Sequence, residues 1–568
     1  MGFVARRSGG AGRALLTVAA AGAVAAGLFA CYLRLSATFP VGSDGASNAL
    51  EAWSLLHGNW LLRGWTLTDV SFYTTELPEY AAVELARGLN PDVVRTAAAV
   101  TYTLLVLAAA ALARGRARGR EGWTRALLAA GIMLAPQLGN GIHVLLSQPD
   151  HIGTQVPVLG LFLLIDRGPR RWYTVAGVWA LLTVVIVADK IAIVDAAVPL
   201  AFVGLLHATW AIAPGPAGRL RAQWFELSLA AAAAAATATA GLLIAGVSRL
   251  GGFSVLPVQT GLATPGRVPA NLWLALHGTL TLFGADVTAV TPAGGPADAQ
   301  AALAWLHAPG AVLAIAAFAV VAWRVPCPRD LTGDVLAVGI VVNLAAFVAS
   351  VIPATAFDTR EMAAVLPFGA VLAGRVFGPR LARSPVAVAG LALAGACQAA
   401  ALGYGAARPA AADPEQALAG WLGAHHLTSG LGTFTESNVT TLDSGGTVRL
   451  AAVSWLPPTT PAACPRPSGA SASYDPPACA DTAGGAVPRL YQSAASWYDP
   501  ATARSNFVVT GTADGSADLI PRAEILALAG PPDRTYRFAD FTIMVWNKNL
   551  LPLLGGPPSP APGDIGHA

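Results

Sequence analysis

The stretch FPVGSDGASNALEAWSLLHGNWLLRGWTLTDVSFYTTELPEYAAVELARGLNPDVVR, from Phe39 to Arg95, decides the fold expected for this chain. It carries several carboxylates and lies between two apolar runs that are long enough to cross a bilayer. If it faces the outside of the membrane, Asp44 lies about one helical turn beyond the end of the first span. We therefore expect residues 35–92 to form an outer loop that holds a reacting carboxylate.

The composition is that of an integral membrane protein. Of 568 residues, 54% are hydrophobic and 12% are charged, whereas soluble domains carry roughly 25% charged residues. Apolar runs recur from Ala14 to Gly403, and the rest of the chain is polar and rich in Gly and Pro. We predict a polytopic transmembrane body over residues 1–409 and an extracytoplasmic domain over residues 410–568.

Apolar length and flanking charges predict about 11 spans. They are placed near residues 14–34, 93–113, 126–146, 153–166, 173–188, 191–212, 225–247, 301–323, 331–353, 362–378 and 386–407. The segment 271–286 is short and has His277 and Gly278 at its centre, so we expect a surface or re-entrant helix there. With an odd number of spans, the two ends of the body face opposite sides of the membrane.

Arginine clusters set the expected orientation. They comprise Arg6, Arg7 and Arg13, then Arg114, Arg116, Arg118, Arg120 and Arg125, and then Arg167, Arg170 and Arg171. Cationic loops stay in the cytoplasm, so the N-terminus is expected there and a nucleic-acid partner is not. The first apolar run is longer than the core of a signal peptide and is expected to be retained. The Ala, Arg and Gly bias with scarce lysine indicates a multi-pass protein of a bacterial plasma membrane.

The C-terminal part is expected to be a small α/β domain, which gives a mainly α fold overall. The runs TVRLAAVSWL, SNFVVTG and YRFADFTIMVW are rich in β-branched and aromatic residues, and PRAEILALAG is typical of a short helix. Cys464 and Cys479 bracket a loop and would form a disulfide in an oxidising compartment, with reduced cytosolic thiols as the alternative.

Polar residues gather at the expected outer ends of the spans. Five loops supply them: Asp44, Glu51, Glu76 and Glu79; Ser147, Asp150 and His151; Asp189, Lys190 and Asp195; Arg249 and Arg267; Asp358, Arg360 and Glu361. Ionised groups at membrane depth cost about 2.5–3.5 kcal/mol each on insertion scales, so such a gathering usually marks a site.

Asp44 lies at the start of ASNALEAWSLLHG, whose apolar residues recur with helical spacing. The plain interpretation is that Asp44 caps this helix. A first span, an acidic residue just beyond the membrane, a surface helix that ends in LLHGN and a second span together resemble the GT-C class of polytopic glycosyltransferases. The resemblance is to the branch that contains protein O-mannosyltransferases, the aminoarabinose transferase and the arabinosyltransferases.

This resemblance implies a polyprenyl-phosphate sugar as donor on the outer face and an Asp or Glu of the first outer loop as general base. Asp44 matches that base. The acidic pair common in the class is here Ser43-Asp44-Gly45, which puts a paired-carboxylate or metal-binding role in doubt, although Glu76 or Glu79 could supply the second carboxylate. We therefore predict no metal ligands and no certain cofactor, and leave a divalent cation open.

Transfer from a phosphate-linked sugar needs a base beside the acceptor hydroxyl and cations beside the departing phosphate. Lys190 lies in VADKIAIVD between two apolar runs and would place a point charge at the membrane surface. The alternative for Lys190 is a structural ion pair with Asp189 or Asp195.

Arg360 in AFDTREM is the second candidate for the phosphate, because its guanidinium offers a fork of donors. Its alternative is an ion pair with Asp358 or Glu361. His151 in SQPDHIGTQVP could bind phosphate or sugar hydroxyls together with Asp150, or it could simply cap a helix.

The sequence thus predicts an inverting membrane glycosyltransferase that acts on a cell-envelope glycan, lipid or protein. Two other classes stay open, a transporter or lipid flippase and a non-catalytic envelope-assembly protein. The expected catalytic residues are Asp44 and Glu76, and the expected substrate-binding residues are Glu79, Asp150, His151, Lys190 and Arg360.

Overall fold

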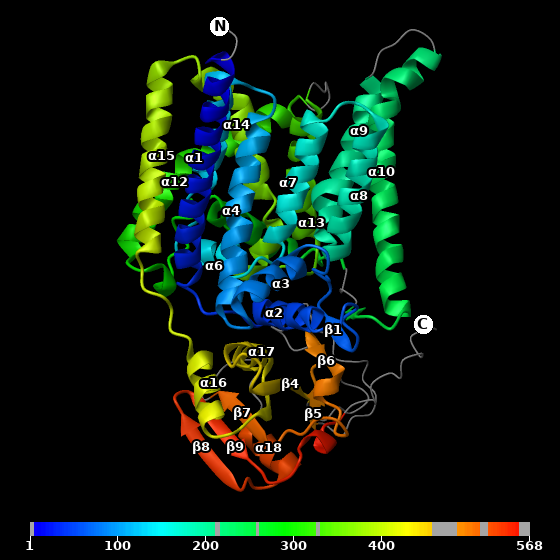
Figure 1. Ribbon diagram of the computed structural model, residues 1–568, viewed down its shortest axis with the longest axis vertical. Helices are drawn as coiled ribbons and strands as arrows, with labels where there is room; N and C mark the ends of the chain where they lie inside the picture. The colour runs from blue at the N-terminus through cyan, green and yellow to red at the C-terminus, as the bar shows by residue number, and fades with distance from the viewer. Residues whose placement is uncertain are drawn as a thin grey trace.

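The computed structural model describes residues 5–210, 216–256, 261–324, 330–456, 485–511 and 521–555. Long helices form one layer, a strand-containing C-terminal region forms another, and helices α2 and α3 lie between them (Figure 1). The expected mainly helical fold with strands near the C-terminus is therefore confirmed. The N-terminus lies at the end of the helical layer that is far from the C-terminal strands (Figure 1).

The helices of the body form from the apolar stretches of the sequence. They are α1 (Ala5–Ser36), α4 (Asp92–Arg114), α5 (Gly119–Met133), α6 (Asn140–Leu146), α7 (Ile152–Arg167), α8 (Trp172–Ala188), the π-helix η1 (Ile193–Ala197), α9 (Val198–Trp210), α10 (Pro216–Arg249), α11 (Val268–Leu282), the 3₁₀ helix η2 (Pro292–Gly294), α12 (Ala297–Ala322), α13 (Leu331–Ala349), the 3₁₀ helix η3 (Ala356–Met362), α14 (Val365–Leu381) and α15 (Pro385–Ala406).

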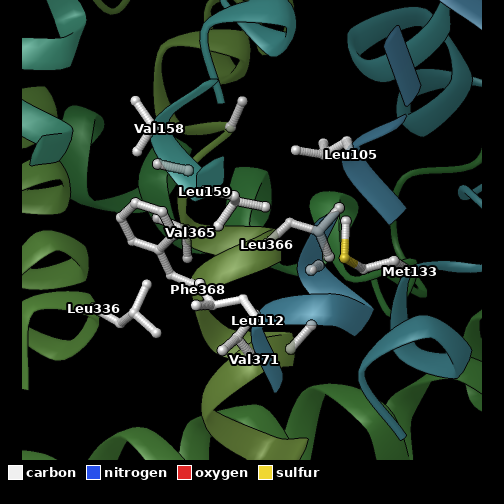
Figure 2. Close-up of a cluster of buried hydrophobic side chains, with 14 of the residues drawn as sticks. Leu105, Leu112, Met133, Val158, Leu159, Leu336, Val365, Leu366, Phe368 and Val371 are labelled. Atoms are coloured by element: carbon white, nitrogen blue, oxygen red, sulfur yellow. The ribbon is translucent and has the colours of Figure 1, made fainter. Parts of the chain in front are cut away.

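Helix α14 lies at the centre of the body, and side chains of α4, α5, α7 and α13 meet it around Leu366 and Phe368 (Figure 2). Gly374 of α14 lets α5 approach closely, because a Cβ at this position would lie 2.6 Å from the carbonyl oxygen of Arg125. Burial of this apolar core fixes the helices whose outer ends carry the site.

Six helices in the described ranges are long and apolar enough to cross a membrane, or seven if η3 and α14, bent by 52°, count as one span. The six are Val18–Ser36, Asp92–Arg114, Gln223–Arg249, Ala297–Ala322, Leu331–Ala349 and Pro385–Ala406. The expected count of about 11 is not confirmed, because several other apolar helices are shorter than the roughly 20 residues that a span needs. The segment 271–286, expected not to span, overlaps the 15-residue helix α11.

Two outer helices and one small sheet cover the end of the body. The helices are α2 (Ser43–Leu56) and α3 (Glu76–Arg87). The sheet joins three distant segments in the order β2 (Ser254–Val255), β1 (Trp65–Leu67) and β6 (Ser493–Ala494). Strand β1 is parallel to β2 and antiparallel to β6. Because β6 belongs to the C-terminal region, this sheet ties that region to the first outer loop.

The C-terminal region is built on a six-stranded sheet in the order β5-β4-β3-β7-β9-β8. Its strands are β3 (Ser429–Gly432), β4 (Arg449–Leu456), β5 (Gly485–Pro488), β7 (Phe507–Gly511), β8 (Arg534–Phe538) and β9 (Phe541–Val545), and it also holds α16 (Pro414–Ala424), α17 (Phe434–Asp443), α18 (Arg522–Ala529) and the 3₁₀ helices η4 (Ala495–Trp497) and η5 (Leu551–Leu553). The expected strands and the short helix α18 are present. The predicted disulfide between Cys464 and Cys479 lies outside the described residues.

Candidate active site

Asp44 and Arg360 form an ion pair where α2 meets η3. The Arg360 Nη1 donates to the Asp44 Oδ2 at 3.1 Å, and the two side chains are 21% and 17% exposed. Asp44 lies in the first turn of α2, whose N-cap residue is Gly42. Its carboxylate therefore serves an ion pair at a partly open surface rather than a cap.

A stack of flat side chains holds the Arg360 guanidinium in place. Arg360 lies 4.4 Å from the ring centre of Phe357, Phe357 stacks on His143 at 4.5 Å, and His143 stacks on Phe39 at 5.1 Å. Asp358 is not the partner of Arg360, because its carboxylate accepts from the backbone N–H of Thr355 at 2.6 Å and caps η3. The alternative pairing with Asp358 is thus not the one that forms.

His151 bridges two carboxylates deeper in the same region. Its Nδ1 lies 2.8 Å from Asp189 Oδ2, and its Nε2 lies 3.2 Å from Glu361 Oε1. Burial alone would lower the pKa of His151, but Glu361 and Asp189 raise it to about 10, so the imidazole is charged at neutral pH. His151 also has a φ of 62°, a costly backbone conformation that tends to occur at functional sites.

Asp150 ties this region to α2. Its two carboxylate oxygens accept from Asn48 Nδ2 at 2.8 Å and from Gln148 Nε2 at 2.9 Å, and the Gln148 Oε1 accepts from the Gly45 N–H at 3.1 Å. Burial raises the pKa of Asp150 to about 7, although Arg360 opposes this rise. Asp150 is fully engaged with protein donors, which indicates that it positions α2.

Glu76 and Glu79 lie apart from the Asp44–Arg360 pair and line a cavity of about 180 Å³. Burial raises the pKa of Glu76 to about 8 and that of Glu79 to about 7. The Thr154 hydroxyl lies 2.7 Å from Asp189 Oδ2 and 3.3 Å from Glu76 Oε1. Glu76 is therefore connected to His151 through Thr154 and Asp189.

Lys190 is exposed, and its ammonium makes no ion pair within the described parts of the chain. Its two expected structural partners are engaged elsewhere, because Asp189 contacts His151 and Asp195 accepts from Gln155 Nε2 at 2.7 Å and from Asn343 Nδ2 at 2.6 Å. Lys190 thus remains available to a ligand, beside the cluster rather than within it.

Two features were not among the expected site residues. Glu361 is the second carboxylate of the cluster, and only its position next to Arg360 in the sequence could have indicated this. The C-terminal region is the other feature, because Ser43 donates to the carbonyl of Phe434 at 3.0 Å and Ser47 donates to that of Gln492 at 3.2 Å. These hydroxyls flank Asp44, so α17 and the segment before β6 cover one side of the pair.

In the described ranges, no three His, Cys, Asp or Glu side chains come together as ligands for a metal ion. The site as described consists of one ion pair, a charged histidine between two carboxylates, and an exposed lysine. Such an arrangement offers a carboxylate that can accept a proton next to cations that can hold an anion.

No protein-family model matches the sequence, and no curated protein matches it either. Solved structures are similar, however, and they show that the fold is the one found in GT-C glycosyltransferases, as the sequence resemblance implied. The structure of ArnT from Cupriavidus metallidurans bound to undecaprenyl phosphate matches with a TM-score of 0.50 and 14% identity, covering 96% of this chain and 99% of that chain. At this identity the likeness concerns the fold alone.

Two structures of the Archaeoglobus fulgidus oligosaccharyltransferase also match, each with a TM-score of 0.42. The complex of AglB with an inhibitory peptide and a dolichol-phosphate is 12% identical, and the match covers 75% of this chain and 64% of that chain. The enzyme tethered to an acceptor peptide with the NVT sequon is 13% identical, with 75% and 63% covered. This chain therefore spans less than two thirds of those enzymes.

Proposed function

We propose that this protein is a membrane glycosyltransferase that moves a sugar from a polyprenyl-phosphate donor to a cell-envelope acceptor, a glycan, lipid or protein, at the outer face. The observation that carries the proposal is the partly exposed Asp44–Arg360 pair at the junction of α2 and η3, in a fold shared with ArnT. In this proposal residues 410–568 form an extracytoplasmic domain, and the N-terminus is cytoplasmic in a bacterial plasma membrane.

The ion pair suggests how donor and acceptor take their places. A donor phosphate binds to the Arg360 guanidinium and replaces the Asp44 carboxylate as its partner, which frees the carboxylate to act as a base. The exposed ammonium of Lys190 adds positive potential for the phosphate, whereas Asp189 and Glu361 balance the charge of His151.

The transfer is then a single nucleophilic displacement at the anomeric carbon of the sugar. Asp44 accepts the proton of an acceptor hydroxyl while the hydroxyl oxygen attacks the anomeric carbon of the sugar. The bond between that carbon and the phosphate oxygen breaks, and the phosphate leaves with the electron pair while Arg360 stabilises its charge. Attack from the side opposite the phosphate inverts the anomeric centre.

The proposal gives supporting roles to three other expected site residues. Glu76 was expected to be catalytic, and Glu79 and Asp150 were expected to bind substrate. Asp150 holds α2, and Glu76 reaches the cluster through Thr154, so both position the catalytic pair. Glu79 does not contact the Asp44–Arg360 pair. Its carboxyl accepts a hydrogen bond from the Thr101 hydroxyl at 2.7 Å and lines the cavity.

The first experiment replaces the base. Asp44→Asn keeps the shape of the side chain and removes its basicity, so we expect the transfer rate to fall by about 10²- to 10⁴-fold with unchanged membrane insertion. The readout is the release of polyprenyl phosphate from donors that carry different sugars. Asp92→Asn is the matched control, because Asp92 is half exposed and lies in surface ion pairs with Arg87 and Arg95. Full activity of Asp44→Asn would remove the proposed role.

A further inference from the structure

Helix α11 has its polar and apolar faces reversed relative to a helix that faces water. The face packed against the protein is partly polar, and its buried residues are Asn271, Ala275, Gly278, Thr281 and Leu282. The outward face is made of large apolar side chains, which are Leu272, Trp273 and Leu276. Trp273 is 65% exposed. Because exposed apolar area is unfavourable in water, this face lies against an apolar medium.

The helix does not cross the bilayer. Its 15 residues span about 22 Å, less than the roughly 30 Å of the hydrocarbon core. Its first turn is tied to the end of α13, because Asn271 Nδ2 donates to the carbonyls of Val348 at 3.0 Å and Ser350 at 2.9 Å, and Arg267 donates to that of Pro353 at 2.7 Å. Since η3 follows this segment directly, α11 lies at the same end of the body as the site.

Helix α11 also packs tightly against η3. A Cβ at Gly278 would lie 2.7 Å from Thr359 Oγ1 and 2.8 Å from the terminal methyl of Met362. Thr359 is buried and precedes Arg360 in the chain. The other short helix that packs on η3 is α6, and most of its residues are buried inside the body. The helix with the exposed apolar face therefore packs directly on the 3₁₀ helix that carries Arg360.

We propose that the outward face of α11 binds the isoprenoid chain of the lipid donor whose phosphate lies at Arg360. The donor is amphiphilic, so a phosphate held at the edge of the bilayer leaves its chain beside the nearest apolar surface. The aromatic ring of Trp273 suits this depth, where such side chains are enriched. This inference rests on the proposed function, and it adds the path of the lipid chain to it.

The experiment compares two probes that share a phosphate and differ in chain length. Undecaprenyl phosphate and geranyl phosphate are each titrated against the purified full chain in detergent micelles, and native mass spectrometry measures the bound fraction. For the double variant Trp273→Ala with Leu276→Ala, we expect undecaprenyl phosphate to bind about tenfold more weakly, because buried apolar area is lost. Binding of geranyl phosphate is expected to be unchanged.

Two further variants separate this inference from the proposed function. Arg360→Gln is expected to weaken the binding of both probes. Normal binding of both probes to Arg360→Gln would remove the proposed function, whereas the result for the Trp273→Ala, Leu276→Ala double variant tests the α11 inference separately. Trp172→Ala is the matched control, because Trp172 is 74% exposed at the start of α8, whereas Asp189, which contacts His151, follows the other end of that helix. It should change neither probe.

Three outcomes would overturn the inference. Unchanged binding of undecaprenyl phosphate to the double variant would mean that bulk lipid covers α11. Equal weakening of both probes would mean that α11 only supports η3. A loss of self-association in the double variant, with probe binding intact, would assign the face to a second copy of this chain.

Discussion

His151 carries the charged imidazole that compensates the buried carboxylates of the site. It touches two carboxylates, Asp189 and Glu361, and Asp189 is fully buried. We expect His151→Gln to lower the free energy of unfolding by about 3 kcal/mol, because removing one partner leaves a buried charge without compensation. Thermal unfolding of the purified variant measures this, with His57→Gln as control, since His57 is exposed.

The same residue predicts how stability depends on pH. The folded-state pKa of His151 is raised from 6.5 to about 10, so its contribution is complete below pH 6.5 and is lost as the pH rises through about 10. The difference in melting temperature between the natural protein and His151→Gln should therefore shrink over this window. A difference that stays constant up to pH 10 would show that the histidine acts without its charge.

Glu76 gives the same direction of pH dependence over a lower range, since burial raises the pKa of its carboxyl from 4.5 to about 8. The unfolded chain ionises first, so the folded state loses stability as the pH rises from 4.5 to about 8. Glu76→Gln cannot ionise, and we expect it to match the natural protein near pH 4.5 and to exceed it above pH 8 by on the order of 1–3 kcal/mol. Melting curves across this range test it, and parallel curves would contradict it.

Sequence reasoning selected Asp44, His151 and Arg360 as candidates from their residue types and from their places next to apolar runs. It could not identify their partners, because Asp44 and Arg360 are 316 positions apart and only the tertiary structure brings them together. For the same reason the alternative considered for Arg360 was an ion pair with Asp358 or Glu361, its neighbours in the chain.

At the scale of elements, the contact between α11 and η3 is one that a single added methyl group can disturb. Gly278→Ala places a methyl group on Thr359 and Met362, so we expect a loss of about 1–3 kcal/mol in stability and weaker phosphate binding as η3 shifts. Gly241→Ala in α10 is the control, because nothing lies within 4 Å of its added Cβ. Phosphate binding measured with geranyl phosphate should fall only in the first variant.

The span expected at 126–146 shows why apolar length alone misjudged the elements. The structure breaks this run into α5 and α6, with Pro136 and Gly139 in the break and Gly139 at a φ of 76°. Proline ends a helix and glycine allows the left-handed turn, whereas the apolar character of Leu134 and Leu138 hides both signals in a hydropathy window. In the C-terminal region, β-branched and aromatic residues predicted β4, β7 and the run that forms β8 and β9, but β3 and β5 hold too few such residues to be recognised.

For the whole molecule, the opposite positions of the N-terminus and the C-terminal strands predict opposite sides of the membrane (Figure 1). Alkaline phosphatase, which is active only outside the cytoplasm, should be active when fused to the C-terminal end. The same enzyme inserted in the loop between α4 and α5 should be inactive, because that loop carries Arg116 and Arg118. Activity in the loop fusion alone would reverse the proposed orientation.

The small sheet of β2, β1 and β6 has a consequence for biosynthesis. Ser47 bonds to the carbonyl of Gln492, which follows 445 positions later, and β1 gains its antiparallel neighbour only from Ser493 and Ala494. The ribosome must therefore synthesise most of the chain before α2 acquires its cover. A nascent chain has Asp44 long before this enclosure exists, so assembly of the complete site is delayed until synthesis is nearly finished.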